Sequence, residues 1–83
     1  MTTGVENRQS GLVDYLIAAL AQATRPRDIE LIAAHLGDVG DPRAIRPLLA
    51  RLGDAKVHGD SYVEDAVCRA LIALGVIRRM PGA

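Results

Sequence analysis

The sequence predicts an all-α fold in which two helical hairpins stack into a short α-solenoid. Apolar residues recur at intervals of three and four through four segments, which is the spacing of one helical face. No segment alternates apolar and polar residues over the length of a strand. The only aromatic residues are two tyrosines, so Leu, Ile, Val and Ala must fill the core, and such cores favour closely packed helices.

The first hairpin is expected over residues 11–40. Residues 1–10 are mostly polar and are expected to form a flexible tail, because they bury too little apolar surface to order themselves. The first helix is expected over residues 11–23, and the second over residues 28–39. Gly40 then supplies the exit from the second helix.

The second hairpin is expected over residues 41–77. Its first helix, residues 42–52, has the most regular apolar stripe of the chain, which is expected to be buried: Ile45, Leu48, Leu49 and Leu52. Residues 53–60 read as a polar loop, and residues 61–77 as the last helix. A frayed end is expected over residues 78–83.

An internal repeat supports this division. The first helices match at an offset of 32 residues, with Leu16 over Leu48, and the second helices match at an offset of 35, with Leu36 over Leu71. A helix pair that repeats with an insertion in one loop is typical of solenoid proteins.

Residues 36–49, LGDVGDPRAIRPLL, resemble a junction between repeats in HEAT-like proteins of the phycobilin-lyase type. The resemblance covers about residues 12–76 and implies two HEAT-like repeats, with Pro47 as a kink inside the third helix. Members of the family often carry a Val-Arg pair where this chain has Val63 and Glu64. Because the family includes subunits that attach bilin chromophores to proteins, the resemblance implies one alternative function, an accessory subunit of a chromophore lyase-like enzyme.

Composition disfavours several other classes of function. Ten basic and ten acidic residues give a formal net charge of zero, without the excess of positive charge typical of nucleic-acid and anionic-membrane binders. A single cysteine, no secretory leader and no apolar run of the roughly 20 residues that span a bilayer predict a soluble cytoplasmic protein. Cys68, His35 and His58 do not stand at metal-ligand spacings, so we expect no catalytic residue, metal or cofactor.

Three arginines of the third helix form a candidate polar surface: Arg43, Arg46 and Arg51. They project away from the apolar stripe, where guanidinium groups can contact phosphates or carboxylates. Aspartates nearby offset their charge, and no aromatic residues interleave with them for base stacking. Nucleic-acid binding is therefore only the third hypothesis.

The outer helices carry more apolar residues than two hairpins need. On the last helix Cys68, Ile72 and Val76 are expected to project away from the core, and on the first helix Leu12 and Tyr15 border the apolar face. Two repeats without polar caps leave faces that another repeat would normally cover. The leading hypothesis is therefore a non-catalytic interaction or scaffold module, which forms a homodimer or docks onto a larger protein through these residues.

Overall fold

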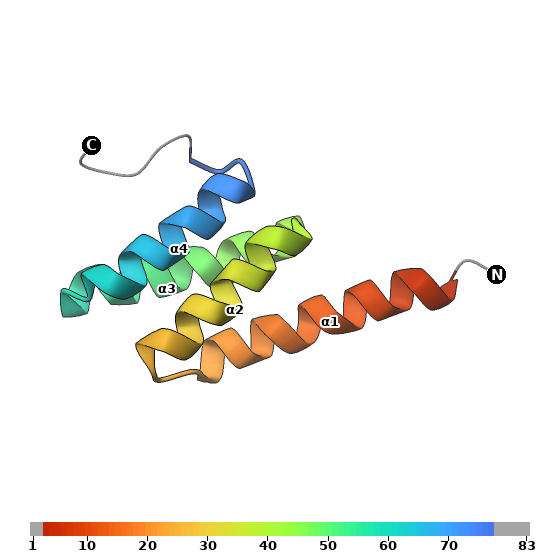
Figure 1. Cartoon of the computed structure of the whole chain (residues 1–83), viewed down its shortest axis with the longest axis horizontal. Helices are drawn as coiled ribbons and strands as arrows, with labels where there is room; N and C mark the ends of the chain where they lie inside the picture. Colours follow the sequence, from red (N-terminus) through yellow and green to blue (C-terminus); the bar gives the residue numbers. More distant parts are fainter. Residues whose placement is uncertain (1–2, 78–83) are drawn as a thin grey trace.

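The computed structural model describes residues 3–77, with side chains from residue 11 onward (Figure 1). These residues form helices and turns without any strand, so the all-α expectation is confirmed. In chain order the elements are α1 (Thr3–Gln22), α2 (Pro26–Val39), the 3-10 turn η1 (Pro42–Ala44), α3 (Ile45–His58) and α4 (Ser61–Ala73). Residues 1–2 of the expected tail and the frayed end expected over residues 78–83 lie outside the described residues.

Helix α1 is longer than expected. It begins at Thr3, so residues 3–10 continue the helix where a flexible tail was expected. The segment contains Glu, Arg and Gln, which are good helix formers, and no proline. Adding a residue to an existing helix costs far less than nucleating a new one, so the packed part of α1 can extend through this segment. In Figure 1 this end projects beyond the other helices.

Helices α2 and α4 end in the same way. The left-handed Gly40, with φ 76°, follows α2, and the left-handed Gly75, with φ 82°, follows α4 after Leu74. Glycine adopts this conformation without the strain that a Cβ atom adds. The expected end of α2 at Val39 is therefore confirmed, whereas α4 stops before the expected residue 77.

The polar loop expected over residues 53–60 was wrong, because α3 continues to His58. Gly53 lies inside the helix, and the buried Ala55 continues the core-facing stripe beyond it. The helix ends at Gly59, whose φ of 68° is left-handed. Asp60 then caps α4 by accepting a hydrogen bond of 3.1 Å from the backbone N–H of Val63.

Pro47 was expected to kink the interior of a helix, but it is the third residue of α3. Backbone N–H groups in a first turn have no partner within the helix, so a proline there loses no hydrogen bond. The 3-10 turn η1 precedes α3, and Asp41 caps it by accepting a hydrogen bond of 2.9 Å from the backbone N–H of Arg43.

Helix α2 lies between α1 and α4, and α3 packs behind α4 (Figure 1). Helices α2 and α4 approach each other closely, because a Cβ atom on Gly37 would meet the Cα atom of Ala70 at 3.2 Å. The largest fully buried side chains come from all four helices: Val13, Leu20, Leu36, Leu48, Val67, Cys68 and Leu71. One core therefore joins the two hairpins.

Candidate interaction surfaces

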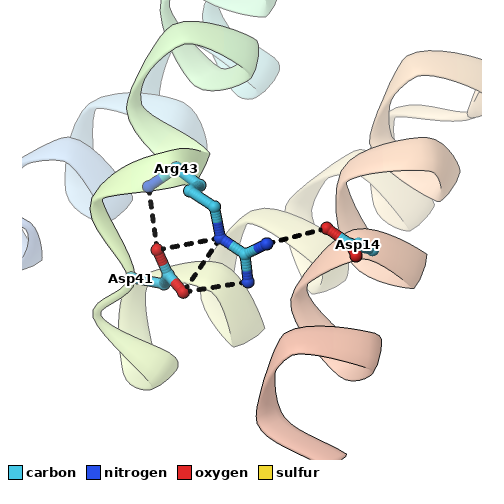
Figure 2. Close-up of polar contacts among 3 residues, drawn as sticks. All are labelled: Asp14, Asp41 and Arg43. Atoms are coloured by element: carbon cyan, nitrogen blue, oxygen red, sulfur yellow. Dashed lines mark hydrogen bonds and ion pairs between the residues drawn. The ribbon is translucent and has the colours of Figure 1, made fainter. Parts of the chain in front are cut away.

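Arg43 ties the start of the second hairpin to α1 (Figure 2). Its guanidinium donates to the carboxylate of Asp14 on α1 at 3.0 Å and to that of Asp41 at 3.1 Å. The backbone N–H of Arg43 and then its guanidinium lower the pKa of Asp41, and the hydrogen bond with Asp41 raises the pKa of Arg43. Two carboxylates thus already occupy this arginine.

Arg51 holds the end of α1. Its Nε donates to the carbonyl of Leu20 at 2.9 Å, and its Nη2 donates to the carbonyls of Ala21 at 3.1 Å and Ala23 at 2.5 Å. The last turn of α1 contains no basic residue of its own. A guanidinium from α3 therefore satisfies the carbonyls at the negative end of the α1 dipole.

The three arginines of the candidate polar surface do not form one free basic patch. Arg46 is exposed as expected, but Arg51 is partly buried against α1, so its expected role on an open surface was wrong. Sequence reasoning missed Asp14 as a partner of Arg43 and missed the carbonyls that Arg51 binds. One signal could have predicted the contacts of Arg51. The last turn of α1 contains no basic residue, so its carbonyls need a donor from elsewhere in the chain.

The candidate interface on α4 is only partly at the surface. Val76 is exposed and Ile72 is half-buried, but Cys68 is fully buried, so its expected exposure was wrong. Helix α3 extends to His58 and packs against α4. Burial and then the carboxylate of Glu64 raise the pKa of the Cys68 thiol.

The first hairpin presents an apolar face to solvent. On α1, Leu12 is 49% and Tyr15 is 70% exposed, as expected for candidate interface residues. Sequence reasoning missed Leu31 on α2, which is 52% exposed. A shallow groove of about 390 Å³ runs between the two helices, and its lining residues are Ala19, Gln22, Ala23, Asp28, Leu31 and Ile32. We call the set Leu12, Tyr15, Ala18, Asp28 and Leu31 the first-hairpin face.

The second hairpin presents a different face. Leu49 is 44% exposed, so its expected place in the buried stripe was wrong, whereas Leu48 is fully buried. Leu49 stands one residue further around α3 than Leu48, about 100° away on the helix. We call the set Arg46, Leu49, Lys56 and Ile72 the second-hairpin face; Arg46 and Lys56 are both exposed.

A third surface feature is an open groove of about 460 Å³ between α2 and α4. Its walls carry Glu30, Asp38 and Asp65 above a floor of alanines. Tyr62 donates to Glu30 at 2.5 Å, and Arg69 pairs with Asp65 at 2.9 Å. Among residues 11–77, whose side chains the structure describes, no three His, Cys, Asp or Glu side chains come together as a metal site.

Among the described helices, none combines the length and the apolar character needed to cross a membrane. Comparison of the chain with protein-family models, with curated proteins and with solved structures finds no match.

Proposed function

We propose that this chain is a non-catalytic protein–protein interaction module, built of two HEAT-like helical hairpins stacked as a short α-solenoid. The observation that carries the proposal is the exposure of large apolar side chains on the first-hairpin face. Leu12, Tyr15 and Leu31 are each about half or more exposed, on two adjacent helices with a shallow groove beside them. Large apolar side chains exposed on neighbouring helices are a feature of surfaces that bind another protein.

The chemistry of the face suits a protein partner. Tyr15 offers an apolar ring with a polar hydroxyl, the combination enriched in protein interfaces. Full burial of a large apolar side chain contributes about 1.5–3 kcal/mol, so covering the exposed halves of three such residues contributes roughly 3 kcal/mol. The carboxylate of Asp28 lies at the rim of the groove, where a polar group can set the orientation of the partner.

Affinity capture with a matched variant tests the proposal. The bait is the full chain, and the control bait carries Tyr15→Ser and Leu31→Ser. Both positions are exposed, so the control bait should keep the helical circular dichroism of the original protein. We expect a partner, either another protein or the chain itself, that binds the original bait directly and binds the control at least tenfold more weakly. Equal binding to both baits would exclude the first-hairpin face as the interaction surface.

A further inference from the structure

The two hairpins correspond residue by residue. Leu16 on α1 and Leu48 on α3 stand 32 residues apart and are both buried. Gly40 and Gly75, which end the second helices, stand 35 residues apart and are both left-handed. Residues 13–22 of α1 therefore have counterparts 32 positions later on α3, and residues 26–38 of α2 have counterparts 35 positions later on α4.

Inside the chain, the two first helices border a common groove. Ile17 of α1 lines this groove of about 430 Å³ together with Pro47 and Ala50 of α3. Ile17 is partly buried and packs against the core. The groove therefore shows which side of α1 lies toward α3 within the chain.

The same parts are repeated at the two outer faces. The counterpart of Ile17 is Leu49, which is 44% exposed on the second-hairpin face. The counterparts of Pro47 and Ala50 are Tyr15 and Ala18, which are exposed on the first-hairpin face. The second-hairpin face therefore carries the counterpart of Ile17, and the first-hairpin face carries the counterparts of the α3 residues that share a groove with Ile17.

The charges on the two faces are also complementary. Lys56 lies on the second-hairpin face and Asp28 lies on the first-hairpin face. Both are exposed. Each face therefore carries a charge opposite to one on the other face, and such charges can pair when the two faces meet.

We propose that the partner of this module is a second copy of the chain, bound head to tail. The second-hairpin face of one copy binds the first-hairpin face of the next, so that Leu49 packs against Tyr15 and Ala18 and Lys56 pairs with Asp28. This inference rests on the proposed function and names its partner. Because the two faces differ, every bound pair leaves one face of each kind free, and the copies assemble into open chains.

The contact is narrower than the one inside the chain. Gly37 and Ala70 allow the close approach of α2 and α4, but their counterparts are Ile72 and His35. These larger side chains hold α4 of one copy away from α2 of the next. The contact therefore rests on α3 against α1, and an interface of this small size associates weakly, at protein concentrations of tens of micromolar.

Sedimentation equilibrium of the full chain tests the proposal. Between about 10 and 200 μM the weight-average mass should rise well above the monomer mass of 8.8 kDa. Leu49→Glu and Tyr15→Glu should each remain monomeric, because each variant has one damaged face. An equimolar mixture of the two should form a one-to-one dimer, because the intact face of each variant fits the other. Val57→Glu, at a position 82% exposed on α3, is the matched control and should associate like the original protein.

Each other outcome contradicts the proposal. A monomeric original protein at about 200 μM would overturn self-association, while the capture of a different protein would still support the proposed function. Self-association without dimer formation in the mixture would indicate two like faces. If Leu49→Glu loses its helical circular dichroism, charge reversal at Lys56 and Asp28 tests the arrangement instead. Lys56→Glu should weaken association at least threefold and Asp28→Lys should restore it, and a failure to restore it would overturn the arrangement.

Discussion

Removing the Arg51 side chain should destabilise the protein far more than its position on a polar helix face predicts. The guanidinium donates three hydrogen bonds to carbonyls at the end of α1, and the bonds to Leu20 and Ala23 are partly buried. An intramolecular hydrogen bond contributes about 0.5–1.5 kcal/mol net, so the two partly buried bonds contribute about 1–3 kcal/mol, and water can replace the exposed bond to Ala21. Loss of a cation at a helix C-terminus adds about 0.3–1 kcal/mol.

We therefore expect Arg51→Ala to lower the free energy of unfolding by about 2–3 kcal/mol, which corresponds to a Tm lower by roughly 10 °C for a domain of this size. Arg46→Ala, on the same helix but exposed, is the matched control and should cost less than about 0.5 kcal/mol. Arg51→Lys keeps the charge but loses the planar fork, so it should fall between them. Urea and thermal melts monitored by circular dichroism measure all three. Equal stabilities of Arg51→Ala and Arg46→Ala would refute the role assigned to the guanidinium.

Three further predictions test the packing. Leu48→Ala should cost about 2–5 kcal/mol and its neighbour Leu49→Ala less than about 1 kcal/mol in urea melts, and the reverse order would show that the faces of α3 are misassigned. Gly37→Val should destabilise by about 1–3 kcal/mol because its Cβ meets the Ala70 backbone, whereas Gly53→Ala, with open space around it, should stabilise by about 0.5–1 kcal/mol; a stabilising Gly37→Val would contradict the close approach. Burial raises the pKa of the Cys68 thiol in the folded state, so above the ordinary thiol pKa of about 8.5 the unfolded chain binds fewer protons than the folded chain and the free energy of unfolding should fall as the pH rises above about 8.5. Cys68→Ala should lack this decrease, and an equal decrease in both proteins would exclude the thiol as its cause.

Local sequence signals predicted the helices well because they depend on near neighbours. The spacing of apolar residues located all four helices, and Gly40 marked the end of α2 correctly. The same signals misplaced the end of α3, because Gly53 and Gly59 both read as stops and only the second adopts the left-handed conformation. A glycine can either continue a helix or end it, and the packing of its neighbours determines which. Here the buried Ala55 keeps the helix in contact with the core beyond Gly53.

The surfaces were harder to predict because they depend on contacts across the chain. Leu48 and Leu49 both fit the apolar stripe of α3, and which of them is buried depends on where α1 and α4 lie. Cys68 appeared exposed on a helical wheel because it lies beside Asp65 and Arg69, and a helical wheel does not show that a second side of α4 is covered as well. Arg51 binds carbonyls about 30 positions earlier, a distance at which helical periodicity carries no information.

The location of the contact between copies is the central claim, and chemical-shift mapping tests it most directly. The Tyr15→Glu protein, labelled with ¹⁵N, is titrated with unlabelled Leu49→Glu protein, and the labels are then exchanged. We predict shifts around Leu49 and Lys56 in the first titration, and around residue 15 and Asp28 in the second. Shifts at the same residues in both titrations, or none in either at concentrations where the original protein associates, would contradict a head-to-tail contact between unlike faces.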